Sequence, residues 1–463
     1  MHKQLSRALA GVVAGLVATG VMSLVMLGAK RLGALGEPPP RRLTRRLLSP
    51  LGAQPRGGGL NAMALFAHAA FGGAMGGPFA LLPGRYKTQA TGRLFGLGVW
   101  AAMYGVLLPR LGLMPRVRRD RPGRPSAMVV AHLAYGATLA AVERAISPIS
   151  AELRGKVVVV CGGSRGLGRA LAGELVQRGA RVAICARKAE ALIETQRWLE
   201  SQGAKVLADV CDLRDEAQSR TFLRRVEQEL GAIDVLIANA ATIDVGPVEA
   251  LRPSDFNAAM SEIFGSAMNA TLAVLPAMRA RRNGAIVIVS SVGGRLGVPH
   301  LSAYSSAKFA QIGFAEALSA EVAKDGVRVL TVTPGLMRTG SHVHATFRGQ
   351  SEHELAWFGA SAMAPLVSIG VERAARHIVR AIARRERYLT FTPAAHVGIW
   401  LHDVAPHLFA FLAAAVARLL PNGGGPAASS QGRKGSEVFR ESPSTLLRWM
   451  AQWSAPLMAK NGQ

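Results

Sequence analysis

The pattern of hydrophobic and polar residues changes near residue 150. Before that point, uncharged stretches alternate with basic loops; after it, short β-branched runs alternate with helix-like stretches. Ala8–Ala29 contains no charged residue, and as a helix it would extend ~33 Å, which is enough to cross a bilayer core of ~30 Å. The pattern therefore predicts an all-α transmembrane region over 1–150, followed by an α/β region.

Three further uncharged stretches are weaker candidates for membrane helices: Gly57–Gly84, Leu94–Pro109 and Pro125–Val142. Four spans is the predicted number, with three or two as alternatives, because the second stretch is rich in Gly and the third is short. A secretory signal peptide is the alternative for Ala8–Ala29. That run is longer than a usual signal core, and no clear small-residue cleavage site follows it.

The second and fourth stretches share a motif. Ala67-His68-Ala-Ala-Phe71-Gly72 recurs 64 residues later as Ala131-His132-Leu-Ala-Tyr135-Gly136, which suggests two helical hairpins of related design. Ionisable residues inside a span are functional candidates. The alternative for both His is a neutral ring hydrogen-bonded across a helix interface, and the surrounding small residues favour it. Nothing else in the sequence supports a haem or metal held by the pair.

Basic residues are concentrated in two loops, 30–56 and 110–124. With four spans, both loops lie opposite the C-terminal region, and the positive-inside rule then puts that region outside the cytosol. The cofactor motifs below instead require a C-terminal domain that faces the cytosol. We give those motifs more weight because they are more specific, and the protein is then an integral membrane protein of a cytoplasmic-type membrane.

Strands and helices alternate from Leu153 onward. The predicted strands are Lys156–Val160, Ala180–Cys185, Lys205–Val210, Ile233–Ile237, Ala285–Val289 and Val327–Val332. The first is followed at once by a glycine-rich turn, 161–168, and then by a helix-like stretch to Arg178. Glycines let backbone N–H groups approach a pyrophosphate, and a helix N-terminus favours its charge. The order predicts a Rossmann-type, doubly wound parallel sheet that binds a dinucleotide.

Ser291, Tyr304 and Lys308 carry the candidate catalytic chemistry. Tyr304 and Lys308 are four residues apart and share a helix face. An ammonium within about 4 Å of a phenol contributes roughly 4 kcal/mol at an effective dielectric of ~20, which predicts a Tyr304 pKa lowered towards neutrality. Tyr304 would then be the general acid of carbonyl reduction or the base of alcohol oxidation. Ser291 would hydrogen-bond the substrate oxygen.

On these motifs, residues from about 153 to 395 resemble the short-chain dehydrogenase/reductase family. The family's glycine pattern is matched by Gly162, Gly166 and Gly168, with Cys161 in place of Thr, and the Ser, Tyr and Lys all match. The resemblance implies that Asp212 contacts adenine and that the Pro-Gly turn with Thr339 contacts the nicotinamide. Motif and charge together predict these cofactor-binding residues: Gly162, Ser164, Arg165, Gly166, Leu167, Gly168, Arg187, Asp212, Asn239, Tyr304, Lys308, Pro334, Gly335 and Thr339.

One position departs from the family pattern. Glu262 stands where the family has a catalytic Asn that helps to hold a relay water, and it is expected to bring a charge near Lys308. The segment from Thr339 to about Pro365 corresponds to the family's substrate lid. Its His342 and His344 are either substrate contacts or part of a plain surface loop.

The predicted cofactor is NADP(H) rather than NAD(H). An acidic residue at the end of the second strand would select NAD by bonding the ribose hydroxyls, but here the strand ends in Cys185-Ala186-Arg187-Lys188. Arg165 adds a second cation, and charge-assisted Arg–phosphate bonds are among the stronger ones. The alternative is that these are solvated surface cations.

Composition narrows the class of protein. Hydrophobic residues make up 49% of the chain and charged residues 18%. This composition is too apolar for a disordered chain, and its hydrophobic content is high for a soluble enzyme. Of the net charge of +26, +16 lies in residues 1–150. Basic clusters beside apolar segments favour anionic membrane lipid, and no nucleic-acid-binding motif is present. Cys161, Cys185 and Cys211 fit neither a disulfide scaffold nor a zinc site and are expected to be free thiols.

The region after 395 is a predicted extension. Tyr388–His402 and Val404–Ala417 are uncharged but too short to span, Pro421–Ser436 resembles a flexible linker, and a stretch from Leu446 to Leu457 is amphipathic. These apolar parts are candidates for lying in the membrane interface, for covering the lid or for packing on the enzyme core.

Together these features predict three regions, namely a membrane domain (1–150), a catalytic domain (151–395) and an apolar extension (396–463). The predicted activity is NADP(H)-dependent interconversion of a lipophilic ketone or aldehyde and its alcohol. The alternatives are an inactive NADP-binding scaffold or redox sensor, and a nucleotide-regulated transporter. The resemblance implies dimers or tetramers.

Overall fold

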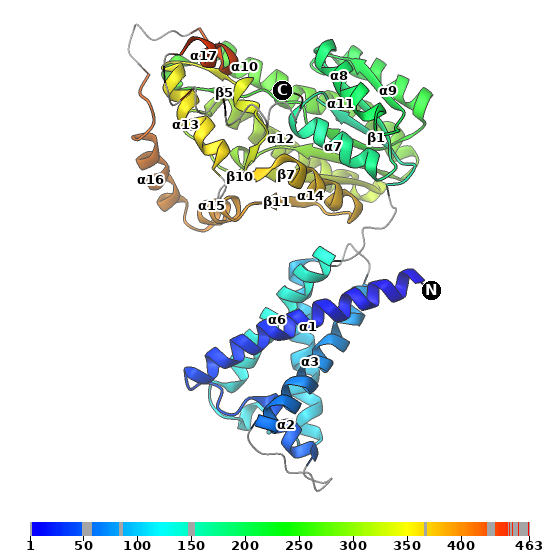
Figure 1. Ribbon diagram of the computed structural model, residues 1–463, viewed down its shortest axis with the longest axis vertical. Helices are drawn as coiled ribbons and strands as arrows, with labels where there is room; N and C mark the ends of the chain where they lie inside the picture. The colour runs from blue at the N-terminus through cyan, green and yellow to red at the C-terminus, as the bar shows by residue number, and fades with distance from the viewer. Residues whose placement is uncertain are drawn as a thin grey trace. The chain divides into compact units, whose positions relative to one another are not determined.

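A computed structural model describes residues 2–48, 58–82, 87–146, 153–364, 368–423 and 431–442, with isolated positions beyond them. Its internal contacts divide it into two compact units, Met1–Ile149 and Ser150–Gln463 (Figure 1).

The first unit is all-helical. Its elements are α1 (His2–Arg31), α2 (Pro39–Leu48), α3 (Gly58–Leu81), α4 (Gln89–Trp100), the π-helical η3 (Ala101–Leu107), α5 (Leu108–Arg110), η4 (Val117–Arg119) and α6 (Arg124–Ile146). Among its described residues, four segments are long and apolar enough to cross a membrane: Ala8–Arg31, Gly58–Leu81, Gln89–Arg110 and Arg124–Arg144. They coincide with the four uncharged stretches of the sequence. A fifth, Pro253–Ala280, lies in the second unit, where α11 (Ser266–Ala280) packs against the sheet.

Glycines set the packing of two helix pairs, α1 with α3 and α4 with α6. A Cβ at Gly15 would collide with the Gly72 carbonyl oxygen, and a Cβ at Gly92 would collide with that of Gly136. Small residues let helix backbones approach this closely in membrane proteins. Gly72 and Gly136 are the last residues of the repeated motif, so its two copies occupy matching places in the two pairs.

The motif's polar groups are used in hydrogen bonds. The Tyr135 hydroxyl donates to the Gly72 carbonyl at 2.6 Å, and His132 Nδ1 lies 2.7 Å from the Met128 carbonyl oxygen. His68 Nδ1 lies 3.4 Å from the Ser23 hydroxyl. These contacts agree with a packing role for both His, and within the described residues neither belongs to a cluster suited to a metal ion.

The close glycine crossing gives a stability prediction. Gly92→Leu is expected to destabilise the protein by roughly 1–3 kcal/mol, because the new side chain forces α4 away from α6. The thermal unfolding midpoint of the detergent-solubilised full chain measures this. Gly98→Leu is the matched control on α4, because a Cβ at Gly98 meets nothing within 4 Å. Equal midpoints for the two variants would contradict the close packing.

The second unit is built on a seven-stranded parallel sheet, in the order β11-β7-β6-β4-β1-β2-β3. The strands are β1 (Val157–Cys161), β2 (Arg181–Ala186), β3 (Val206–Val210), β4 (Ile233–Ala238), β6 (Gly284–Val289), β7 (Val327–Pro334) and β11 (Tyr388–Phe391). The predicted Rossmann-type fold is confirmed. Residues 388–391, which the sequence placed in the uncharged stretch Tyr388–His402, are the edge strand of this sheet.

Helices cover both faces of the sheet (Figure 1). The core on one face includes residues of α7 (Gly166–Gln177), α8 (Ala189–Glu200) and α14 (Val371–Ala383); the core on the other face includes residues of α9 (Glu216–Leu230), α11 and α12 (Ser302–Val322). Along β1, Val158 and Val160 enter the first core, and Val157 and Val159 enter the second. Because both faces are covered, the strands are continuous apolar runs.

Smaller elements lie beyond the carboxyl ends of the strands. They include η5 (Val248–Ala250), α10 (Pro253–Ala259), η6 (Met260–Gly265), η7 (Val292–Gly294), η9 (Ser341–Val343), α13 (Ser351–Met363), α15 (Pro393–Val404), α16 (Pro406–Ala417) and α17 (Gly435–Glu441). At the opposite edge, η8 (Ala323–Asp325) follows α12 and leads into β7. A two-stranded sheet joins β8 (Leu336–Arg338) to β10 (Ser368–Gly370). A three-stranded sheet has the order β12-β9-β5, with β5 at Asp244–Val245, β9 at Thr346–Phe347 and β12 at Arg433–Lys434.

The region after 395 is more ordered than the sequence predicted. β12 and α17 fall within or just after the supposed linker Pro421–Ser436, and β12 pairs with β9 of the lid. Residues 424–430 and most of the amphipathic stretch 446–457 lie outside the described residues.

Candidate functional site

The glycine turn joins β1 to α7 and requires its glycines. Gly162 and Gly166 have φ angles of 72° and 53°, which side chains disfavour. A Cβ at Gly162 would lie 2.9 Å from Ala240 Cα, and a Cβ at Gly168 would collide with the Gly162 carbonyl oxygen. Asn239 Nδ2 donates to the same carbonyl at 3.2 Å. The glycine turn and the turn after β4 therefore form one packed unit at the carboxyl edge of the sheet.

Ser291, Tyr304 and Lys308 come together at that edge. Ser291 follows β6, and its hydroxyl accepts from the Gly293 N–H at 3.1 Å. Tyr304 and Lys308 stand on α12, with Lys308 Nζ 5.7 Å from the centre of the Tyr304 ring. Lys308 is 2% exposed, and its ammonium donates to the Val289 carbonyl at 2.9 Å and to Gln311 Oε1 at 3.1 Å.

Burial controls the protonation of the pair. It lowers the pKa of Lys308 to about 7 and raises that of Tyr304, for which a hydrogen bond with Ser291 acts in the opposite direction. The expectation that Lys308 lowers the pKa of Tyr304 is therefore not met. The cause is desolvation: the ammonium is held by Val289 and Gln311, and its own charge is costly at this depth.

This buried Lys gives a pH prediction. Its folded-state pKa is lowered, so its unfavourable contribution to stability is fully present below about 7 and is relieved as the pH rises towards the unfolded value of 10.5. The unfolding free energy of the wild type, relative to Lys308→Met, should rise by about 2 kcal/mol between about pH 7 and about pH 9. Thermal midpoints of both proteins measure it. A constant difference would mean that Lys308 keeps an ordinary pKa.

Glu262 pairs with two arginines, and its charge contributes no shift to the pKa of Lys308, contrary to the expectation from the sequence. It lies in the π-helical turn η6, and Glu262 Oε1 is 3.2 Å from Arg187 Nη1 and 3.5 Å from Arg214 Nη1. The contact from this turn to the Lys308 region is made by the backbone: Gln311 Nε2 donates to the Ile263 carbonyl at 2.8 Å. Sequence reasoning missed Gln311, although its position three residues after Lys308 puts it on the same helix face.

Cations gather where the glycine turn meets the end of β2. Burial, and then the charge of Arg187, lower the pKa of Arg165. His344 lies near the same cations. Its pKa is lowered to about 4, mainly by burial and then by the charges of Arg165, Lys188 and Lys434. Such a group of cations favours an anionic ligand.

The other predicted cofactor residues border the same edge. Asp212 accepts from Arg214 Nη2 at 2.6 Å, and this bond lowers its pKa. Ser164 and Leu167 are buried in the turn. Pro334 ends β7, Gly335 lies against Thr392, and the buried Thr339 hydroxyl accepts from the Ser341 N–H at 3.1 Å.

The lid is attached to the loop before Tyr304. Glu354 of α13 is fully buried; its carboxylate lies 2.7 Å from His300 Nδ1 and accepts from Trp357 Nε1 at 2.7 Å. His342 is buried against Phe439 of α17, with ring centres 5.8 Å apart. The lid is therefore packed on the enzyme, and the surface-loop alternative for His342 is wrong.

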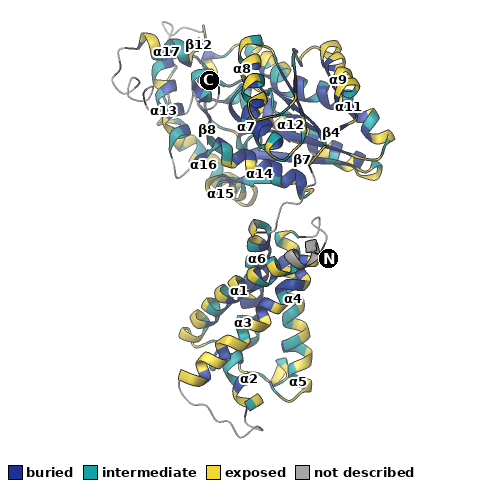
Figure 2. Ribbon diagram, turned by 45° about the vertical axis from the view of Figure 1, so that its right-hand side comes forward, coloured by how far each residue is buried: buried dark blue, intermediate teal, exposed yellow. Residues whose placement is uncertain are grey.

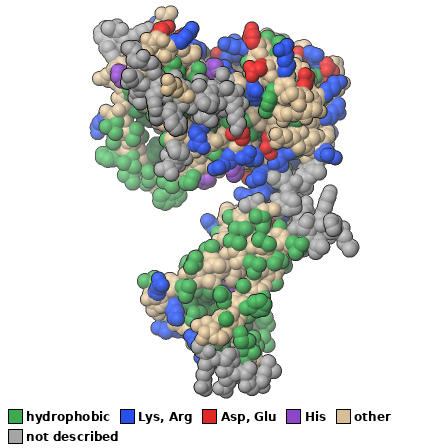
Figure 3. Space-filling view, in the orientation of Figure 1, with side chains coloured by type: hydrophobic (Ala, Val, Ile, Leu, Met, Phe, Trp, Pro, Cys, Tyr) green, Lys and Arg blue, Asp and Glu red, His purple; other side chains and the backbone are tan. Residues whose placement is uncertain are grey.

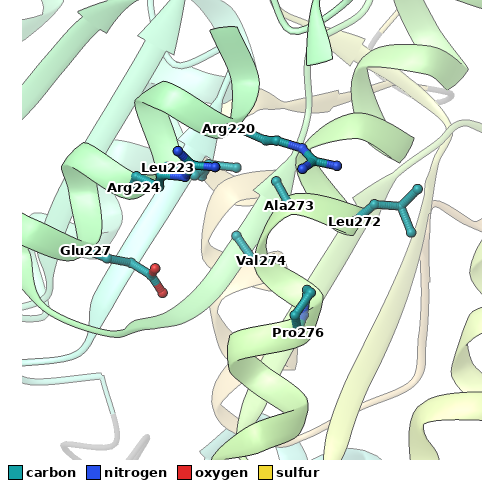
Figure 4. Close-up of a pocket in the computed structure, with 8 residues that line it drawn as sticks. All are labelled: Arg220, Leu223, Arg224, Glu227, Leu272, Ala273, Val274 and Pro276. Atoms are coloured by element: carbon teal, nitrogen blue, oxygen red, sulfur yellow. The ribbon is translucent and has the colours of Figure 1, made fainter. Parts of the chain in front are cut away.

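Two other features lie apart from this chemistry. Figure 4 shows a pocket lined by residues of α9 and α11, from Arg220 to Pro276, and none of them belongs to a loop at the carboxyl edge. Cys161, Cys185 and Cys211 are buried free thiols, as expected. The pKa values of Cys185 and Cys211 are raised, mainly by hydrogen bonds among the thiols and by burial, so neither is poised as a thiolate.

Comparison with known proteins shows which family has this sequence and fold. The family model of short chain dehydrogenases matches residues 156–347. A dehydrogenase/reductase SDR family protein 7-like of Anopheles gambiae is 34% identical over 267 residues, which are 56% of this chain and 81% of that protein. A 3-ketodihydrosphingosine reductase of Mus musculus is 37% identical over 202 residues, 41% of this chain and 61% of that protein.

Solved structures agree with these relatives. A short-chain dehydrogenase from Streptomyces avermitilis has 28% sequence identity and a TM-score of 0.50, over 57% of this chain and 97% of its own. The Anopheles gambiae relative is 34% identical over most of that protein's length, and the fold is the same as that of the solved short-chain dehydrogenase. The chain is therefore an oxidoreductase that belongs to the short-chain dehydrogenase/reductase family.

Proposed function

We propose that the protein is a membrane-tethered, NADP(H)-dependent oxidoreductase that interconverts a lipophilic ketone or aldehyde and its alcohol. One observation carries the proposal: Ser291, Tyr304 and Lys308 meet at the same sheet edge as the glycine turn. When bound there, the nicotinamide cofactor would supply or accept the hydride. All other steps would fall to side chains of this chain.

Tyr304 is the proposed proton donor in reduction and acceptor in oxidation. Ser291 would hydrogen-bond the substrate oxygen and hold it beside the phenol. Lys308, fixed by Val289 and Gln311, would keep the cationic environment of Tyr304 in place, and the link from Gln311 to Ile263 would fix that position.

The preference for NADP(H) rests on Arg165 and Arg187. The two guanidiniums are close enough for one to lower the pKa of the other, and a 2′-phosphate between them would relieve that repulsion. Around the same turn, the residues proposed to hold the rest of the cofactor are those predicted from the motifs, with Asp212 at the adenine and Thr339 at the nicotinamide.

The lipophilic substrate and the membrane location are supported by two observations. A relative is a 3-ketodihydrosphingosine reductase, which by its name acts on a lipid ketone. Four segments of the first unit have the length and hydropathy of membrane spans. We place the catalytic unit on the cytosolic side, where NADPH is available, although the basic loops favour the opposite orientation.

The test is NADPH consumption by the detergent-solubilised full chain with a panel of lipophilic ketones and aldehydes, with NADH as the cofactor control. Oxidation of NADPH that depends on one compound class supports the proposal and narrows the substrate. Tight NADPH binding without turnover of any compound would refute the enzymatic role and leave a cofactor-binding scaffold.

A further inference from the structure

The exposed apolar helices α15 and α16 form the largest feature of the catalytic unit that its proposed chemistry does not use. No residue of α16 is buried, and α15 buries only Ala395. Their exposed large side chains are Val397, Trp400, Val404, Leu408, Phe411, Leu412 and Val416. We call α15 and α16 the apolar hairpin, since the two helices pack against each other. Figure 2 shows this hairpin as mostly exposed, and Figure 3 shows hydrophobic side chains gathered over it.

The length and polarity of the hairpin exclude two ordinary roles. Each helix has 12 residues, about 18 Å, so neither reaches across a bilayer core of ~30 Å. A helix of this length usually belongs to a protein core, but Phe411 and Trp400 are 67% and 63% exposed. An apolar helix that neither spans nor enters a core fits the membrane interface, where its side chains reach the acyl boundary.

The base of the hairpin stands beside the proposed substrate site. Thr392, which caps α15, contacts Gly335, and a Cβ at Gly398 would lie only 3.1 Å from Leu296 Cδ1, in the loop that follows Ser291. Arg295 of the same loop is 3.1 Å from Asp403, the one acidic residue between the start of α15 and the end of α16. The hairpin is therefore joined on its inner side to the two loops that border the substrate and nicotinamide positions.

From these contacts we infer that the apolar hairpin inserts into the surface of the bilayer and that the lipophilic substrate enters the site along its base, from the membrane. The inference rests on the proposed function, in that the substrate is lipophilic and the first unit is in the membrane. Only residues 147–152 separate the described parts of the two units, so a first unit embedded in lipid tethers the catalytic unit by a short segment to the same bilayer. Arg418, exposed at the end of α16, suits the lipid headgroups there.

Lipid contact can be measured without any enzymatic activity. The native cysteines are buried, so a single introduced cysteine accepts an environment-sensitive fluorophore selectively. Phe411→Cys is labelled in the full chain and reconstituted into vesicles of phosphatidylcholine with a minor fraction of phosphatidylglycerol. Glu216→Cys is the control, on α9, which Figures 1 and 2 place at the other end of the catalytic unit. We expect nitroxide-labelled acyl chains to quench the label at 411 and aqueous iodide to quench the label at 216.

Two results would overturn the inference. Quenching of the label at 411 by iodide would put the hairpin in water, and protection from both quenchers would mean that a protein surface, such as a second copy of the chain, covers it. Neither result bears on whether the enzyme oxidises NADPH, so failure of the inference and failure of the proposed function are distinguishable.

Substrate entry is tested by kinetics in the same vesicles. Trp400→Ser together with Phe411→Ser should raise the KM for a membrane-dissolved ketone about tenfold. The kcat for that ketone, and the KM for a small water-soluble carbonyl compound, should stay as in the wild type. An equal loss with both substrates would indicate structural damage and contradict the proposed entry path.

Discussion

Tyr304→Phe should lower kcat for carbonyl reduction by roughly 10²–10⁴-fold, the usual contribution of a positioned acid or base. The variant loses only the hydroxyl, so the ring keeps its place on α12 between Ser291 and Lys308. NADPH binding, followed by the quenching of protein fluorescence, should weaken far less than kcat falls, since Tyr304 is one of many proposed cofactor contacts and the glycine turn and the cations at the end of β2 are unchanged. Steady-state kinetics with the substrate found in the panel would measure the loss.

Burial of the Tyr304 phenol sharpens this expectation. Because desolvation raises its pKa, the neutral form is the stable one in the free enzyme, and a proton is available for reduction at neutral pH. Ser302→Ala is the matched control on the same helix, two residues before Tyr304 and so on roughly the opposite side of α12. Loss of activity in both variants, or in neither, would count against Tyr304 as the proton donor.

Arg187→Asp should reverse the cofactor preference. Without the guanidinium, the 2′-phosphate loses a charge-assisted hydrogen bond, and the new carboxylate repels it. The kcat/KM for NADPH should therefore fall about 10²-fold. The same carboxylate can bond the ribose hydroxyls of NADH, whose kcat/KM should rise. Arg220→Asp, an equal change of charge on α9, controls for a general electrostatic effect. A preference that stays with NADPH would remove Arg187 from the cofactor site.

Glu262, the ion-pair partner of Arg187, provides a second test of the cofactor preference. Glu262 holds Arg187 and Arg214 through contacts of 3.2 and 3.5 Å, so a 2′-phosphate has to compete with a carboxylate for the same guanidinium. In Glu262→Gln that competition ends, and NADPH should bind several-fold more tightly while NADH binding is unchanged. The two substitutions thus shift the affinity for NADPH in opposite directions.

The sequence was sufficient to predict those parts of the structure that depend on a local pattern of residues. Continuous β-branched runs, glycines and the four-residue spacing of Tyr304 and Lys308 predicted the parallel sheet, the turn after β1 and the common helix face. These features depend on neighbours in the chain or on backbone conformation at one turn. The uncharged stretches before residue 150 likewise predicted the positions of the four long apolar helices.

Features that depend on distant partners could not be predicted in this way. The direction of the Glu262 side chain is set by the π-helical turn that carries it, and no local pattern specifies Arg187 as its partner. Residues 388–391 are too few to be distinguished from the apolar helices that follow, yet pairing with β7 makes them a strand. Residues 433–434 lie in a Gly- and Ser-rich stretch, yet they pair with β9 as a strand.

The pairing of β12 with β9 also sets an order of events during synthesis. The strands that bear the nucleotide turns are complete once the ribosome has passed residue 334, but the three-stranded sheet over the lid needs Arg433 and Lys434. At typical elongation rates that interval is on the order of ten seconds. A nascent chain would thus acquire its nucleotide-binding half first and wait, with one edge of β9 unpaired, for its own last strand to complete the three-stranded sheet.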